Sequence, residues 1–322
     1  MRAPHWPDVA IAATRRIVML SNKQNFGLLL GLLGVCLFAA TLPATRIALF
    51  DTNPWFLTSI RAVIAGLAGV TMLIVTRRRL PPRDAIPLLI VCASMVVLGF
   101  PLAVAIAMVT VPSSHGGVIM GILPLATAAA AAVIQHERPS PGFWIAAVIG
   151  SALVMTFALY RSGGHTLSPG DAFLLVAVVC GGIGYTLSGR LSGIMPGWEV
   201  ISWVVTFSLP VALVATALTW PDNIGAITTR GWTAILYVGL VAQYSAFFLW
   251  NAAMAMGGIA RVGQISLLQP FFVVLIAATF AGEELDWQTL FFAAAVVVTV
   301  AIGTRMRVAA PTRRRRSGLH KP

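Results

Sequence analysis

Charged side chains are scarce in this sequence. Only 10% of its 322 residues are Asp, Glu, Lys or Arg, whereas 58% are hydrophobic and the mean hydropathy is +0.88. Soluble domains contain about 25% charged residues, because a chain folded in water needs polar groups on its surface. The composition therefore excludes an ordinary soluble enzyme, a disordered protein and a secreted disulfide scaffold. It indicates a membrane protein whose outer surface faces hydrocarbon.

The sequence also lacks the groups from which metal sites and enzyme active sites are built. Its three cysteines, Cys36, Cys92 and Cys180, lie in separate apolar runs, without a CxxC pair or a Cys/His cluster. A structural disulfide or zinc site is therefore not expected. The five histidines and ten acidic residues are scattered, and neither HExxH nor GxSxG occurs. A membrane-embedded enzyme needs a nucleophile with its base or a set of metal ligands, and the sequence shows neither pattern. We therefore expect no cofactor.

Long uncharged runs are the main feature that is present. A hydrocarbon core about 30 Å thick takes roughly 20 helical residues. The run 85–136 has 52 uncharged residues, which is too long for one span, and its centre near 111–116 contains Pro, Ser and Gly, so it predicts two helices. Together the runs predict ten membrane-spanning helices. They cover 24–45, 62–76, 85–136, 139–160, 172–189, 200–221, 231–260, 262–282 and 287–304.

The basic residues predict the orientation of these helices. If the N-terminal tail is cytoplasmic, 18 of the 22 Lys and Arg residues fall on the cytoplasmic side and only Arg161 and Arg230 on the other. This asymmetry places both termini in the cytoplasm. The net charge of +12 is thus a topological signal, and we expect no nucleic-acid partner. The arginine run 313–316 in the tail is interpreted as a topological lock that contacts anionic lipid.

An internal repeat relates the two halves of the chain. Pro124 and Glu137 are 13 residues apart, as are Pro270 and Glu283, and the two pairs are displaced by 146 residues. Eight of the 31 positions in 107–137 are identical at this displacement. The displacement spans five helices, an odd number, so the second copy crosses the membrane in the opposite sense. The predicted fold is an all-α polytopic membrane protein with ten transmembrane helices as two inverted five-helix repeats.

These features together resemble the EamA-type drug/metabolite transporters. The resemblance rests on a 5 + 5 arrangement, Arg61 in the second helix, prolines in the fourth and ninth helices, and an acidic turn at the end of each repeat, His136-Glu137-Arg138 and Gly282-Glu283-Glu284. It covers roughly residues 26–305. The chain departs from the family pattern with His136 where Gly is usual, and with Arg46 where the first helix commonly carries Lys.

The resemblance implies a helical bundle with a central cavity. It also implies that small polar metabolites, often amino acids, are moved outward across a bacterial inner membrane. We accordingly divide the chain into a cytoplasmic N-terminal tail 1–25, a first EamA-like repeat 26–160, a connecting loop 161–169, a second repeat 170–305 and a basic cytoplasmic tail 306–322.

Two arginines lie within the predicted spans and are candidate substrate-binding residues. Arg46 and Arg61 lie close to the outward ends of the first and second helices. An Arg within a span faces the bundle interior, pairs with another group or extends to the interface. One interpretation is that they extend toward the interface with Asp51 as partner. The other is that one of them binds a substrate carboxylate, which the planar guanidinium fits.

The eighth helix carries a stripe of aromatic and amide side chains. Tyr244, Phe247, Phe248 and Asn251 are spaced at i, i+3, i+4 and i+7, which predicts a shared face. Rings with a few oriented amides suit a metabolite site, whereas helix packing or lipid contact is the structural alternative. The candidate substrate-binding residues besides the arginines are Gln243, Tyr244, Phe247, Trp250, Asn251, Gln264 and Gln269.

Five further residues are candidates for gating and coupling. Pro124 and Pro270 are expected to kink the fourth and ninth helices, because proline removes a backbone hydrogen bond. His115, Glu137 and Glu283 are the candidate groups for proton coupling. No span contains a carboxylate at its centre, which weakens proton antiport through Asp or Glu, and His115 is the group that titrates near physiological pH. The alternative for the two glutamates is a cap on the following helix, and for His115 a loop residue without a role.

The sequence thus favours a secondary transporter that moves a small-molecule substrate through the bilayer by alternating access. A membrane-embedded enzyme and a non-transporting assembly protein are the alternatives.

Overall fold

The computed structural model describes residues 6–111, 116, 119–162, 168–272, 275, 287–306 and 308–309. Two predicted coupling residues, His115 and Glu283, lie outside them. The described elements are almost all helical. They are α1 (Trp6–Ala39), α2 (Thr41–Leu49), α3 (Pro54–Val75), η1 (Arg83–Ala85), α4 (Ile86–Ala93), η2 (Ser94–Gly99), α5 (Phe100–Thr110), α7 (Leu123–Ile134), β1 (Arg138–Pro139), α8 (Pro141–Ser162), α9 (Pro169–Leu191), α10 (Gly197–Leu218), η3 (Ile224–Ala226), α11 (Thr229–Leu236), η4 (Tyr237–Ser245), α12 (Ala246–Gly257), α13 (Ile259–Gly263), η5 (Gln264–Leu268), α15 (Trp287–Arg305) and β2 (Val308–Ala309).

Six helices are long and apolar enough to cross a membrane by length and composition. Three shorter apolar helices accompany them, at Leu123–Ile134, Pro141–Phe157 and Leu290–Arg305. The nearly all-helical class is therefore confirmed, and these spans support a polytopic membrane protein, while the ten spans and the two inverted repeats stay predictions. The six long spans are Lys23–Leu49, Pro54–Val75, Arg83–Thr110, Pro169–Leu191, Gly197–Leu218 and Thr229–Gly257.

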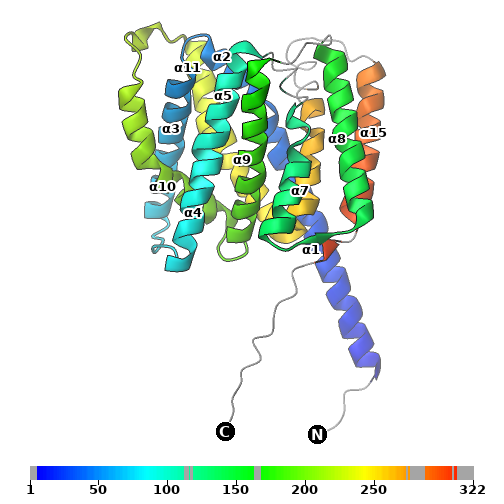
Figure 1. The fold of residues 1–322 in the computed structure, drawn as a ribbon. Helices are drawn as coiled ribbons and strands as arrows, with labels where there is room; N and C mark the ends of the chain where they lie inside the picture. Colours follow the sequence, from blue (N-terminus) through cyan, green and yellow to red (C-terminus); the bar gives the residue numbers. More distant parts are fainter. Residues whose placement is uncertain are drawn as a thin grey trace.

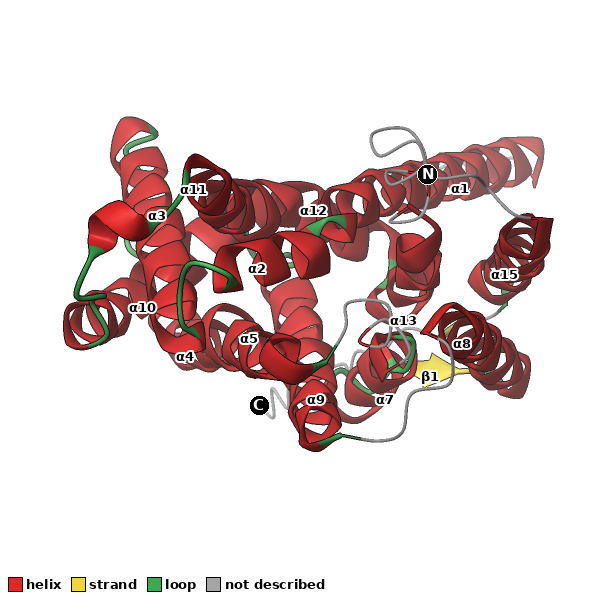
Figure 2. Ribbon diagram, turned by 90° about the horizontal axis from the view of Figure 1, so that it is seen from above, coloured by secondary structure: helices red, strands yellow, loops and turns green. Residues whose placement is uncertain are grey.

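The helices lie side by side with their long axes roughly parallel (Figure 1). We call the end at which α1 enters the bundle and α15 finishes the lower end, as drawn in Figure 1. Seen from above, α3 and α10 lie at one edge of the bundle and α8 and α15 at the other (Figure 2). At the lower end β1 pairs with β2 in an antiparallel register, Arg138 opposite Ala309.

Small residues allow some of these helices to approach closely. A Cβ added to Gly69 of α3 would lie 2.9 Å from the Ser202 carbonyl oxygen of α10, and one added to Gly27 of α1 would lie 2.9 Å from the Gly257 amide nitrogen of α12. Helices in lipid associate through such close packing, since burial of apolar surface does not drive it there. Gly69 and Gly27 therefore set the spacing of the α3–α10 and α1–α12 pairs.

Several helices are interrupted within the bundle. The first span breaks at Ala40 between α1 and α2, and Pro43 beyond it has no N–H to donate to the Ala39 carbonyl. The third and eighth spans contain the π-helical segments η2 and η4. Displaced by 146 residues, η2 would cover 240–245, which is the second part of η4. The sequence carries no obvious signal for either π segment.

The turn after α7 contains a non-glycine residue in the left-handed region. His136 has φ +54° and is exposed, and the following amide of Glu137 donates to the Ala131 carbonyl (3.3 Å). Such a turn at a helix C-terminus is usually formed by Gly, because a Cβ is strained at positive φ. The glycine that the resemblance to EamA-type sequences implies at this position would adopt this φ without strain.

We predict that His136→Gly stabilises the protein by up to about 1 kcal/mol, because it relieves the strain of the Cβ. Thermal unfolding in detergent measures the effect as a rise in Tm. Gln135→Gly is the matched control: Gln135 has φ −101° and closes the helix in a right-handed conformation, so glycine there lowers Tm. An equal fall in Tm for both variants would contradict the presence of strain at His136.

Candidate functional site

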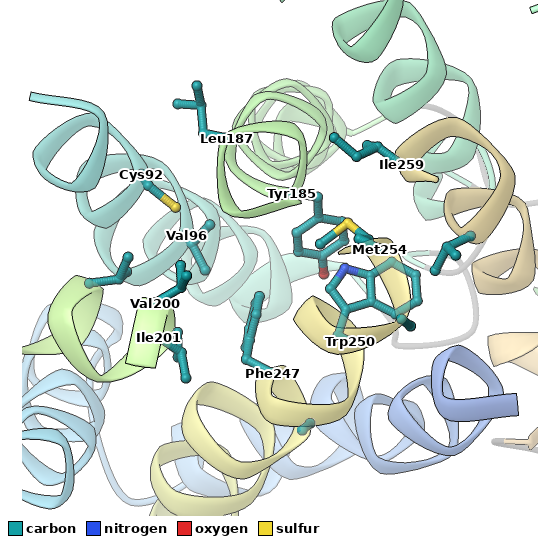
Figure 3. Packing of buried hydrophobic residues seen from close by; sticks show 14 of the residues in the cluster. Cys92, Val96, Tyr185, Leu187, Val200, Ile201, Phe247, Trp250, Met254 and Ile259 are labelled. Carbon is teal, nitrogen blue, oxygen red and sulfur yellow. The ribbon is translucent and has the colours of Figure 1, made fainter. Parts of the chain in front are cut away.

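The centre of the bundle contains a cluster of four aromatic rings. Phe247 and Trp250 of α12 contact Tyr185 of α9, with centroids 5.8 and 5.4 Å apart, at steep interplanar angles. Phe38 at the end of α1 lies 5.1 Å from Phe247 and 6.0 Å from Trp250. Figure 3 shows Tyr185, Phe247 and Trp250 turned toward one another. Two of these residues, Phe38 and Tyr185, were not identified from the sequence, since an aromatic residue in an apolar run carries no distinctive signal.

Trp250 and Tyr244 differ in how their polar atoms are satisfied. Trp250 is 1% exposed, and its indole Nε1 has no partner in the described part of the chain. The Tyr244 hydroxyl lies 2.8 Å from the Ser202 hydroxyl of α10, and its ring meets that of Phe248 edge to face at 4.9 Å. A buried unpaired donor costs about 1–3 kcal/mol, so the Trp250 indole is a position at which a ligand acceptor would be favourable.

Asn251 joins three helices through two hydrogen bonds. Its Oδ1 accepts from the Ser188 hydroxyl of α9 (2.7 Å), and its Nδ2 donates to the Gly197 carbonyl of α10 (3.1 Å). The side chain is fully buried. Because both ends of the amide are already bonded, Asn251 fixes the position of α12 against its neighbours in this conformation.

Gln243 extends from η4 to the corresponding segment of the other half. Its Nε2 donates to the Val97 carbonyl of η2 (3.3 Å), and its Oε1 has no partner among the described residues. Gln243 and Val97 are 146 residues apart, the displacement of the sequence repeat. The side chain is 2% exposed.

The two candidate glutamines of the ninth predicted helix behave differently. Gln264 is completely buried, and neither its Oε1 nor its Nε2 has a partner in the parts of the chain that are described. It packs directly against Gly303 of α15, where any Cβ would overlap its amide. The Gln269 Nε2 donates to the Phe38 carbonyl (3.2 Å). The last four carbonyls of a helix have no intrahelical donor, so Gln269 satisfies one at the end of α1.

Both candidate arginines donate to backbone carbonyls of other helices. Arg61, 4% exposed, donates through Nη2 to the Val238 carbonyl of η4 (3.0 Å), and its Nε has no partner within the described residues. Arg46 donates through Nη1 to the Val111 carbonyl (3.0 Å), which closes α5. Arg61 therefore lies inside the bundle rather than extending to the interface.

The predicted partner of these arginines, Asp51, is engaged elsewhere. Its Oδ2 accepts from the amide of Thr228 (3.0 Å) and from the Thr228 hydroxyl (2.5 Å). Thr228 is the N-cap of α11, where negative charge is favoured by the helix dipole. The interpretation of Asp51 as the partner of Arg46 or Arg61 is therefore wrong.

Pro124 and Pro270 do not kink a continuous helix. Pro124 lies in the first turn of α7, directly after a turn at 121–122. Pro270 lies in the helical turn 269–272 that follows the 3-10 segment η5. Proline is tolerated in a first turn, where its missing N–H has no intrahelical partner. Both residues therefore begin a helical segment after an interruption, which corrects the predicted kink.

Glu137 caps a helix, although not the one that follows it. Its Oε1 accepts from the Ile259 amide (3.2 Å) and its Oε2 from the Ala260 amide (3.1 Å). These amides begin α13, in the other half of the chain. The expectation of a cap on the following helix is wrong, because the turn at His136 directs Glu137 toward α13. The carboxylate thereby joins the two halves at the lower end.

Nothing in the described part of the chain suggests a metal centre, since no group of three His, Cys, Asp or Glu residues comes together there. The site is therefore a set of amides, rings and guanidinium groups among interrupted helices. Polar groups and rings of these kinds orient small molecules where they line a ligand site. The contribution of each candidate residue to binding stays a prediction.

Comparison with known proteins identifies the family. A model of the EamA-like transporter family matches the chain twice, over residues 25–158 and 168–304. "Uncharacterized transporter YdeK" of Bacillus subtilis (strain 168) is 43% identical over 286 residues, which are 88% of this chain and 99% of that protein. "Uncharacterized transporter YwfM" of the same organism is 25% identical over 268 residues, 82% of this chain and 88% of that protein.

A solved crystal structure superposes with a TM-score of 0.72 over 87% of this chain and 97% of its own. The two sequences are only 19% identical, so this similarity shows a shared fold and nothing about function. The family matches and the transporter relatives indicate a membrane transporter, not an enzyme. This chain belongs to the EamA-like transporter family, within the drug/metabolite transporters.

Proposed function

We propose that this protein is a secondary transporter that exports small polar metabolites, most favourably amino acids or related compounds, across the bacterial inner membrane. It works by alternating access between two inverted five-helix repeats, 26–160 and 170–305. The observation that carries this proposal is the hydrogen bond between Gln243 and Val97, which joins repeat-related positions in the middle of the bundle.

Helix packing supports the proposed symmetry. The opening helix of the first half, α1, packs on α12 of the second, and the opening helix of the second half, α9, packs on α5 of the first. Counterparts also meet directly, as α3 with α10 and α8 with α15. A two-fold axis in the membrane plane generates such exchanged pairs. On this axis a residue can contact its own counterpart, as Gln243 contacts Val97.

The distribution of charge supports the orientation. The lower end carries the exposed basic residues Arg77, Arg78, Arg79 and Arg190, and the positive-inside rule assigns that end to the cytoplasm. One of these guanidiniums is engaged, because Arg78 pairs with Glu199 (3.4 Å) and lies over the Trp198 ring. Both termini then lie in the cytoplasm.

The substrate site is formed by polar groups that face the interrupted helices. Gln243 Oε1, Trp250 Nε1 and both polar atoms of Gln264 are unpaired in the described structure, so a polar ligand would gain hydrogen bonds without breaking existing ones. Phe247 and Tyr244 supply ring surface, while Asn251 and Gln269 hold the surrounding helices. Arg61 then exchanges the Val238 carbonyl for a substrate carboxylate, and Arg46 does the same near the upper end.

The remaining candidates act at the ends of the pathway. Pro124 and Pro270 begin helical segments that move as units, which suits a hinge. Glu137 holds α13 at the lower end and is released when that end opens, which makes it a candidate coupling group. His115 and Glu283, which lie outside the described residues, stay candidate coupling groups on the sequence alone.

Reconstituted transport tests this function directly. Proteoliposomes loaded with a panel of labelled amino acids are expected to release at least one compound faster than protein-free vesicles. Loss of all flux from correctly folded protein, against amino acids and against organic acids, would favour the assembly-protein alternative.

Arg61→Gln is predicted to lower transport at least tenfold while the protein stays folded, because the neutral amide loses attraction for a carboxylate. Flux is measured alongside the Tm of the same preparation. Arg230→Gln, which removes an exposed Arg at the upper end, is the control and retains wild-type flux. A well-folded Arg61→Gln protein that transports at the wild-type rate contradicts this role.

Gln243→Leu is predicted to lower transport by an order of magnitude. The variant leaves the buried Val97 carbonyl without this donor, which costs about 1–3 kcal/mol, so Tm falls while the protein stays folded. Ser245→Ala in the same π segment is the control, since Ser245 is exposed and donates only to Leu240. Equal activity of the two variants would place the substrate elsewhere.

A further inference from the structure

A cavity of about 400 Å³ lies at the lower end, apart from the proposed substrate site. Gln24 and Asn25 of α1, Arg261 of α13, and Thr304 and Arg305 of α15 supply its polar lining. α13 and η5 contact both α1 and α15, so the interrupted ninth helix separates these two peripheral helices behind the cavity. α1 and α15 lie at the margin of the bundle in Figure 2.

The positive charge in this cavity is not neutralised by the protein. Arg261 donates to two neutral acceptors, Gln24 Oε1 (3.2 Å) and the Met306 carbonyl (3.1 Å), and its buried Nε has no partner in the described structure. Arg305 has no hydrogen bond or ion pair there, and the lining contains no Asp or Glu. Two guanidiniums without a carboxylate form a site for an anion, and phosphate matches their donor geometry.

The surroundings of the cavity favour a lipid as the source of the phosphate. Leu28 and Ala301 complete the lining, and the neighbouring outer surfaces of α1 and α15 are apolar, with Leu29 51% and Ile302 48% exposed. Free phosphate gains no favourable contact with an apolar surface, whereas the acyl chains of a lipid would cover it. Basic pockets between helices on the cytoplasmic side are suited to anionic headgroups.

We propose that this cavity binds the phosphate of an anionic membrane lipid between Arg261 and Arg305, with the acyl chains along α1 and α15. The headgroup bridges α13 and α15 and adds acceptors for the Arg261 and Arg305 guanidiniums. The bound lipid therefore holds the ninth helix, which carries Gln264, against α15. The proposal needs the cavity and its charge alone, so it does not depend on transport.

The test uses the full chain in neutral detergent, titrated with phosphatidylglycerol, phosphatidylcholine or inorganic phosphate. Phosphatidylglycerol is expected to raise the Tm of the wild type by several degrees, with no comparable rise from phosphatidylcholine or phosphate, because a ligand of the native state stabilises it. A rise with phosphate equal to that with phosphatidylglycerol would overturn the assignment to a lipid.

Arg305→Gln tests the site, because Arg305 makes no bond in the described structure and its loss leaves the fold intact. We expect at least a threefold higher phosphatidylglycerol concentration for half of the Tm rise. Arg230→Gln at the other end of the bundle is the matched loss of one positive charge and keeps the wild-type response. Equal responses of the two variants, or no rise in the wild type, would overturn the proposal. Native mass spectrometry counts the retained lipid and is expected to show one molecule fewer on Arg305→Gln.

Discussion

In hydrocarbon, every backbone carbonyl that a helix releases needs another donor, because no water is present to supply one. In this protein long-range side chains donate to carbonyls at the end of α1 and in the π segments within the bundle. Arg61 bonds Val238, Gln243 bonds Val97 and Gln269 bonds Phe38. Tyr237 similarly donates to the Leu37 carbonyl (2.6 Å). The interrupted helices, the inward polar residues and the contacts between the halves follow from this single constraint.

The same constraint suggests how the bundle can rearrange. Each donor satisfies a carbonyl of a different segment, so a movement of one helix exchanges a bond worth about 1 kcal/mol rather than exposing charge to lipid. Unpaired groups at Gln243, Trp250 and Gln264 lie within this network. A substrate that supplies the missing partners would shift the balance between conformations by its differential binding.

The sequence predicted the parts of the structure that are governed by hydropathy. The long apolar runs include the six long spans. Of the predicted stripe, Tyr244, Phe247 and Asn251 are buried and Phe248 is half-buried. It did not predict how the helices end. The π segments at η2 and η4 arise from packing against other helices, and the partners of Asp51 and Glu137 come from residues far away in the chain. Ser188, a polar residue in the glycine-rich span of α9 that donates to Asn251, was the available signal for the other side of the site.

The most direct test is the accessibility of position 243 from each side of the membrane. A Gln243→Cys variant without the three native cysteines is treated with a membrane-impermeant thiol reagent in right-side-out and inside-out vesicles. Gln243 is 2% exposed in this conformation, and alternating access predicts modification from both sides, slowed when a transported compound is present. Reaction from one side only, at a rate that no compound changes, would contradict a site at the centre of two exchanging repeats.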